Sequence, residues 1–147
     1  MASVYIPQAL RRAVRAADKE RCAYCRTYEK VVGYECEVDH IVPSSAGGQT
    51  AFENLCLCCR ACNGHKASRT SAIAPETGER VALFHPRKQQ WVDHFVWSED
   101  STQILGLTPQ GHATVKALQL NHLNLRIARE YWKLCGVHPP TEEFQGK

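Results

Sequence analysis

Two pairs of closely spaced cysteines constrain this chain more than any other feature of its sequence. Each pair has the spacing Cys-x-x-Cys, in Cys22-Ala-Tyr-Cys25 and in Cys59-Arg-Ala-Cys62. A short turn of this kind presents two thiolates to one tetrahedral ion, and two such turns complete a closed four-cysteine zinc site. The pairs lie farther apart than in a usual zinc ribbon, so we expect a structured insert between them. Free or redox-active thiols are the competing interpretation.

The other four cysteines carry a weaker signal. Cys36 lies in a predicted strand, Cys56 and Cys58 alternate with leucines, and Cys135 ends a helix-like stretch. We interpret each as a small buried apolar residue. Cys56 or Cys58 is an alternative metal ligand, although the Cys-x-Cys spacing fits such a turn less well.

Length and charge leave several classes of protein open. The 147 residues suit a single domain with a modest core, which a structural metal would stabilise. The net charge of +3 permits nucleic-acid binding without requiring it. The sequence shows neither the pattern of a signal peptide nor an apolar run long enough to span a membrane. We therefore expect a soluble, cytoplasmic protein with reduced thiols.

In the first half of the chain, the patterns predict a helix, a strand, a long loop, a strand and a second helix. The first helix carries arginines on one face, which we interpret as solvated, with contact to DNA phosphates as the alternative. Those arginines are Arg11, Arg12 and Arg15. The predicted elements are a helix over 7–20, strands over 31–39 and 54–58, a loop over 43–50 and a helix over 60–69.

The second half predicts a hairpin followed by helices. A turn at 75–78 precedes a short strand over 81–84, and residues 91–97 and 103–107 resemble the two arms of a hairpin. Thr108-Pro109 is a typical helix start, and the helical pattern over 115–134 ends at Gly136, with Asn121 as a candidate break.

The insert between the cysteine pairs contains a carboxylate directly before a histidine, in Glu37-Val-Asp-His-Ile-Val-Pro43. A histidine at the end of a strand can take a proton from water near neutral pH. A neighbouring carboxylate can hold a hard divalent ion through oxygen. Hydrolysis of a phosphodiester requires both an activated water and positive charge beside the phosphate.

An ordered series of residues resembles the HNH endonucleases, in their zinc-stapled branch. The series covers residues 21–69 and consists of Asp39-His40-Ile-Val-Pro43, Gly47-Gly48, Glu53-Asn54-Leu55 and Cys59-Arg-Ala-Cys62-Asn63-Gly-His-Lys66. The resemblance implies an α+β fold, a ββα-metal finger stapled by the four-cysteine zinc site. To it we add an N-terminal helix and a C-terminal hairpin-plus-helix extension. We expect a single domain over 1–147, with the HNH core at 21–69 and the extension, at 77–138, packed on that core.

The resemblance also implies the roles of the site residues. His40 is the general base that activates water, and Asn54 holds the loop or the imidazole in its productive orientation. Asp39 and Asn63 bind the catalytic divalent ion, Mg²⁺ or Mn²⁺, because carboxylate and amide oxygens suit hard ions whereas thiolates suit Zn²⁺. Without the ordered series, an Asp-His pair is more often an ordinary hydrogen bond.

The HNH motif is named after a histidine, an asparagine and a second histidine, and this chain departs from it at the third position. Asn63 stands where that second histidine is expected. His65 is an alternative ligand, but two residues further along a helix it points elsewhere. Lys66 is placed to contact a phosphate, with a solvated helix lysine as the alternative. We add Arg60 and Arg69 as candidate contacts to nucleic acid.

The sequence therefore predicts a metal-dependent endonuclease that cleaves DNA, most naturally double-stranded. A non-catalytic zinc-finger module that binds DNA or RNA is the alternative, and a cysteine-based redox protein is a weaker third. The second half looks like the extension of a subset of bacterial HNH proteins. There, core packing is favoured over nucleic-acid stacking for the tryptophans Trp91 and Trp97.

Overall fold

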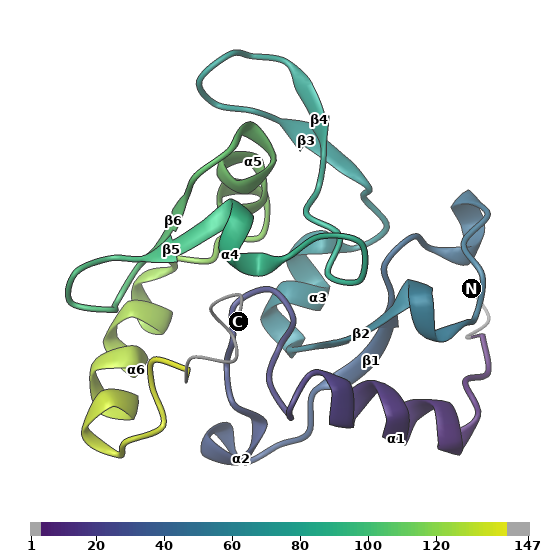
Figure 1. The fold of residues 1–147 in the computed structure, drawn as a ribbon, viewed down its shortest axis with the longest axis horizontal. Coiled ribbons are helices and arrows are strands. Elements are labelled where there is room, and N and C mark those ends of the chain that lie inside the picture. The colour runs from purple at the N-terminus through teal and green to yellow at the C-terminus, as the bar shows by residue number, and fades with distance from the viewer. Residues whose placement is uncertain (1–3, 141–147) are drawn as a thin grey trace. The chain divides into compact units, whose positions relative to one another are not determined.

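The computed structural model describes residues 4–140, which form two compact units (Figure 1). The first unit comprises residues up to 70 together with 85–88, and the second comprises 71–84 together with the residues from 89 onward. The single domain predicted over 1–147, with its extension packed on the core, stays a prediction. Its ends, 1–3 and 141–147, lie outside the described residues.

The first unit contains an antiparallel pair of strands followed by a helix, the ββα order that the sequence predicts. In the pair, Glu37 lies opposite Cys58 and His40 opposite Leu55. The α+β fold class, with helices and small sheets, is confirmed. The elements are α1 (Gln8–Ala17), α2 (Glu29–Val32), β1 (Glu37–His40), two short 3-10 helices (Ser44–Ala46 and Phe52–Asn54), β2 (Leu55–Cys58) and α3 (Arg60–Lys66).

Helix α1 covers β1 and β2 (Figure 1). Its alanine-rich sequence has a high helix propensity, and Val14 is its fully buried side chain. All four residues of β2 are buried, so this strand reads as a continuous apolar run instead of an alternating one. Its cysteines therefore act here as small core residues.

The strand predicted over 31–39 is wrong in its first half. Residues 29–32 form the single turn of α2, and Gly33 ends it with a left-handed φ of 81°. The buried carboxylate of Glu29 accepts hydrogen bonds from the Cys36 backbone N–H at 2.9 Å and from Arg15 Nε at 3.0 Å. These tertiary bonds fix the turn against the local β propensity of the two valines, and β1 begins only at Glu37.

The described part of the second unit is built from two hairpins and three helices. Its elements are β3 (Ser71–Ile73), β4 (Arg80–Ala82), α4 (Trp91–His94), β5 (Phe95–Trp97), β6 (Ile104–Gly106), α5 (Pro109–Ala117) and α6 (Leu123–Leu134). Strand β3 pairs with β4, and β5 with β6. The sequence predicted the second hairpin but missed β3. In the predicted hairpin, the first arm was placed over 91–97, and the first half of that arm forms α4 instead of a strand.

Helix α5 begins as predicted, with Thr108 Oγ1 accepting the Gly111 N–H at 3.0 Å and proline in the first turn. The helical stretch breaks around Asn121, whose side chain bonds the backbone of Ile104 in both directions. Trp91 is 5% exposed and packs against Phe95 and Trp97, which favours core packing over nucleic-acid stacking for Trp91 and Trp97. Among residues 4–140, no helix has the length and hydropathy to cross a membrane.

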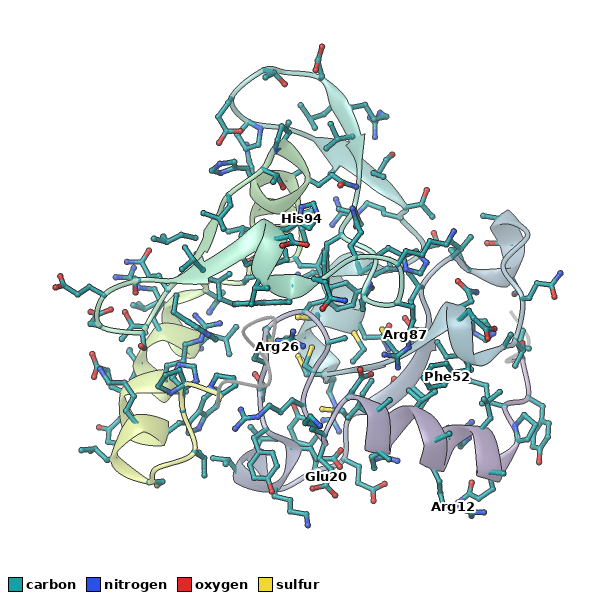
Figure 2. All side chains as sticks on the ribbon, in the orientation of Figure 1. Arg12, Glu20, Arg26, Phe52, Arg87 and His94 are labelled. Carbon is teal, nitrogen blue, oxygen red and sulfur yellow. The ribbon has the colours of Figure 1, made fainter. Side chains whose placement is uncertain are left out.

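A buried ion pair ties residues 85–88 to the first unit. Arg87 donates to both carboxylate oxygens of Asp18, at 2.9 and 3.0 Å, and its guanidinium lies 4.6 Å from the ring centre of Phe52 (Figure 2). Asp18 also accepts the Leu57 N–H at 2.7 Å. The carboxylate that follows α1 thus joins β2 to a segment 69 residues further along the chain.

Replacing Arg87 with alanine is expected to lower the stability of the first unit by about 3 kcal/mol, since a buried carboxylate loses its cationic partner. Hydrogen exchange measured by mass spectrometry on peptides spanning 18 and 57 reports this unit separately from the second. The matched control is Lys88→Ala, because Lys88 is exposed beside Arg87. Equal exchange in the two variants would contradict the structural role of the pair.

Candidate functional site

Four thiols converge in the first unit. The sulfur atoms of Cys22, Cys25, Cys59 and Cys62 all lie within 4.8 Å of one another, and every one of these residues is buried. The Cys25 and Cys59 sulfurs are 3.6 Å apart. A tetrahedral Zn²⁺ with Zn–S bonds of about 2.3 Å holds its sulfurs about 3.8 Å apart, so the cluster has the size of a zinc site.

The backbone holds the two cysteine pairs in complementary ways. The first pair sits in a turn closed by the Arg26 N–H on the Cys22 carbonyl at 3.0 Å, and Ala23 N–H bonds the Leu57 carbonyl at 2.8 Å. The second pair opens α3, where the Cys59 sulfur caps the helix by accepting the Cys62 N–H at 3.4 Å. Strand β2 leads directly into this second pair, so the sheet and the thiols are built together.

The chemistry of the cluster requires a cation. The hydrogen bond with Cys22 and the burial of the site raise the pKa of the Cys62 thiol, since a buried cluster disfavours several thiolates side by side. A divalent ion neutralises these thiolates and converts the thiols to ligands. The donor set therefore fits zinc, and completely buried sulfurs are a poor match to exposed redox thiols.

The remaining cysteines divide into two groups. Cys36, Cys56 and Cys58 are buried, as the interpretation of small apolar residues expects. Cys135 is exposed at the end of α6, so that interpretation is wrong for it.

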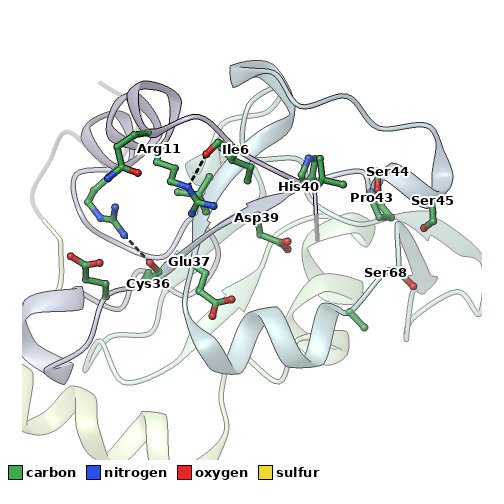
Figure 3. Close-up of a pocket in the computed structure, with 16 residues that line it drawn as sticks. Ile6, Arg11, Cys36, Glu37, Asp39, His40, Pro43, Ser44, Ser45 and Ser68 are labelled. Carbon is green, nitrogen blue, oxygen red and sulfur yellow. Dashed lines mark hydrogen bonds between the residues drawn. The ribbon is translucent and has the colours of Figure 1, made fainter. Parts of the chain in front are cut away.

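A pocket of about 790 Å³ lies at the end of β1 in the first unit (Figure 3). Asp39 and His40 both line it, and both are partly exposed. Figure 3 shows the carboxylates of Glu37 and Asp39 on one side of β1, as the two-residue period of a strand requires. The strand thus presents two acids and a histidine to one solvent-filled space.

The imidazole of His40 is held by a residue in the loop after β1. Its Nε2 lies 2.9 Å from the hydroxyl of Thr50. The hydroxyl accepts from Nε2–H in one tautomer, which leaves Nδ1 unprotonated, and donates to Nε2 in the other, in which Nδ1 carries the proton.

Asn54 fastens the same loop. Its Oδ1 accepts the Val42 N–H, and its Nδ2 donates to the carbonyls of Val42 and Gln49, all at 2.9 Å. A side chain on Gly48 would collide with the Val42 carbonyl, so glycine is required where the loop approaches these bonds. Of the two functions expected for Asn54, its hydrogen bonds correspond to holding the loop, while Thr50 contacts the imidazole.

Asn63 reaches from α3 to β1. Its Nδ2 donates to Glu37 Oε1 at 2.7 Å. A carboxylate only accepts hydrogen bonds, so the amide nitrogen must face Glu37 and the amide oxygen must face away from it. The oxygen that a hard cation prefers is thereby left for other partners. The choice of Asn63 over His65 as a ligand stays a prediction.

Lys66 is buried beneath the site, which contradicts its interpretation as a solvated helix lysine. It is 2% exposed, and among the described residues its Nζ has no hydrogen-bond partner. Burial raises the pKa of the Asp39 carboxyl, and the positive charge of Lys66 opposes that increase. Lys66 therefore acts electrostatically on Asp39, and its contact with a phosphate stays a prediction.

The two arginines predicted to bind nucleic acid lie at the ends of α3. Arg60 is exposed and stacks 4.6 Å from the ring centre of Tyr34, whereas Arg69 is exposed and donates to the His65 carbonyl at 2.6 Å. Neither residue lines the pocket. Their contacts with nucleic acid stay predictions.

Residues 22–69 match the family model described as HNH endonuclease. The matched segment begins at the first zinc-type cysteine and ends after α3, so it contains both cysteine pairs, β1, β2 and the loop between them. This segment of the chain is therefore similar to HNH endonucleases. Neither the search of curated proteins nor that of solved structures produced a match.

Sequence reasoning missed two residues at this site. Glu37 shares the strand face of Asp39, and the i, i+2 alternation of β1 was a sufficient signal for it. Thr50 had no comparable signal, because its approach to His40 depends on how the intervening loop closes.

Purified protein is expected to contain one zinc per chain, and removing it with a strong chelator is expected to unfold the first unit. Metal analysis and circular dichroism before and after chelation measure both effects. Cys62→Ser is expected to lose the zinc, whereas Cys135→Ser, at an exposed position, retains it. Four freely reactive thiols in the untreated protein would contradict a closed metal site.

Proposed function

We propose that this protein is a metal-dependent endonuclease that hydrolyses DNA phosphodiester bonds, with double-stranded DNA as its substrate. The observation that carries the proposal is the His40 imidazole, held by Thr50 at the mouth of an open pocket that also contains the Asp39 carboxylate. The similarity of residues 22–69 to HNH endonucleases supports an action on nucleic acid.

His40 serves as the general base. With its Nε2–H donated to Thr50 Oγ1, Nδ1 takes a proton from a water molecule in the pocket. Asn54 contributes at a distance, because its bond to the Gln49 carbonyl fixes the loop beside Thr50. In this proposal, Asn54 fixes the loop, the loop positions Thr50, and Thr50 orients the imidazole of His40.

Asp39 and Asn63 hold the catalytic divalent ion in this proposal. The Asp39 carboxylate and the Asn63 amide oxygen are the donor types that Mg²⁺ and Mn²⁺ prefer. Glu37 supports them by fixing the orientation of the Asn63 amide. When bound, the ion supplies positive charge beside the phosphate and the departing oxygen.

The reaction then balances in one displacement. The water that loses a proton to His40 forms a bond to phosphorus, and the bond from phosphorus to the 3′ oxygen breaks. The departing oxygen takes a proton from solvent, which leaves a 3′-hydroxyl and a 5′-phosphate. His40 returns its proton to solvent and is ready for another cycle.

His40→Ala is expected to lower the rate of DNA cleavage at least about 100-fold, because the base is lost. Nicking of supercoiled plasmid by zinc-loaded protein in Mg²⁺, Mn²⁺ or EDTA measures this rate. Thr50→Val, which keeps the shape and removes the hydroxyl, is expected to give a smaller loss.

Zinc content and circular dichroism are the controls for folding, and His122→Ala is the matched histidine variant, because His122 lies on the second unit. Cleavage by His40→Ala at the native rate would contradict the general base. Salt-sensitive DNA binding by native protein, without cleavage in any divalent metal, would favour the non-catalytic binding module.

Replacing Asp39 with alanine is expected to weaken Mn²⁺ binding to zinc-loaded protein more than any other change at the pocket. Glu37→Ala is expected to weaken it about tenfold, the usual effect of losing a residue that orients a metal ligand. Glu37→Gln keeps an oxygen that accepts from Asn63 and is expected to lose less. Isothermal titration without DNA measures these affinities separately from activity.

The matched control is Glu35→Ala, since Glu35 is exposed and lines the same pocket. Mn²⁺ binding that is equal in native protein and Asp39→Ala would refute the proposed ion site. Equal losses of Mn²⁺ affinity in the Glu35 and Glu37 variants would refute the orienting role of Glu37, but not the ion site itself.

A further inference from the structure

The pocket beside Asp39 and His40 has two oppositely charged walls. One wall carries three carboxylates. Glu37 and Asp39 belong to β1, and Glu35 lies two residues before the strand begins. Helix α1 contributes guanidinium groups, from Arg11 and Arg15. Cations are expected at the acidic wall, whereas the arginine wall is suited to an anion.

The two arginines of α1 that line the pocket differ in the partners that they already have. Arg15 donates to the Glu29 carboxylate at 3.0 Å and to the Cys36 carbonyl at 2.8 Å, so it holds the fold together. Arg11 donates only through Nε, to the Ile6 carbonyl at 3.0 Å. Within residues 4–140, no acidic residue pairs with Arg11, although three acids line the same pocket.

The position of Arg11 is fixed before any ligand arrives. Its bond to Ile6 orients the side chain, which Figure 3 shows extending from α1 toward β1. The two terminal amino groups remain for a ligand, and a guanidinium fork with two such groups matches the oxygens of a phosphate. Ser44 and Ser45 are exposed at the same pocket and add hydroxyls that bond phosphate oxygens.

We propose that Arg11 binds a phosphodiester group of the substrate strand, so that the strand lies in the pocket between α1 and the loop after β1. This inference rests on the proposed function, because the strand is the one whose bond is broken at His40. Of the two interpretations that the sequence left open for the α1 arginines, the proposal adopts contact with a DNA phosphate for Arg11, whereas Arg12 is exposed and Arg15 is bonded within the fold.

Arg12 provides a matched control. It is the next residue, is exposed, and lies on the outer side of α1, where Figure 2 shows it extending away from the ribbon. It does not line the pocket. Arg11→Ala and Arg12→Ala therefore remove the same charge from the same helix and differ in whether that charge faces the pocket.

The test measures binding of a labelled DNA duplex by zinc-loaded His40→Ala protein, alone and combined with each arginine variant, over a series of salt concentrations. Arg11→Ala is expected to weaken binding about tenfold and to reduce the slope of log affinity against log salt by about one, the effect of one lost phosphate contact. Arg12→Ala is expected to change the affinity less than about twofold and to leave the slope unchanged.

A purely structural role for Arg11 would not change the salt slope. Zinc content verifies folding, and Arg11→Gln, which keeps the stem and an amide donor for Ile6, replaces the alanine variant where that one is unstable. Equal affinities and slopes for the Arg11 and Arg12 variants, in a protein that binds DNA and cleaves it through His40, would overturn this inference alone. No binding of DNA by the His40→Ala parent, together with no cleavage by native protein, would overturn both proposals.

Discussion

The first unit depends on the convergence of four sulfurs from two distant parts of the chain. One pair precedes α2 and the other opens α3, so an ion at their centre closes the chain around the two strands. A small core gains most from such a closure, because it limits the conformations of the unfolded chain and adds metal bonding to a modest apolar burial. Strand β2 leads directly into Cys59, and Asn63 of α3 bonds Glu37 of β1, so loss of the metal is expected to disturb the pocket as well as the core.

Around this centre, the polar side chains have separate structural tasks. Asp18 accepts the Leu57 N–H, and Glu29 accepts the Cys36 N–H, so buried acids connect the strands to the helices. Asn54 does the same for the loop after β1. Leu57 lies in β2, whereas Cys36 and Val42 lie just outside β1, so these side chains satisfy backbone groups in and beside a two-stranded sheet that offers few partners of its own.

The sequence predicted the ββα order, the sulfur cluster and the end of β1, because each has a local or spacing signal. The cysteine pairs require a common ion, and Thr108-Pro109 starts a helix through its own side chain. The sequence did not predict α2, because its turn depends on the tertiary hydrogen bonds of Glu29. It also did not predict the burial of Lys66, because helical spacing does not reveal what covers a helix. Thr50 was out of reach for the same reason, because its contact with His40 depends on how the loop after β1 closes.

The ion pair between Arg87 and Asp18 also affects whether residues 22–69 could be transferred to another protein as a self-sufficient unit. The segment with family resemblance ends at 69, yet Asp18 lies before it and its cationic partner lies well after it. A graft of residues 22–69 into another protein would therefore leave behind α1, which covers the strands, and the guanidinium that neutralises a buried acid. The first unit is thus discontinuous in sequence, and evolutionary exchange of the second unit would have to preserve the four residues 85–88.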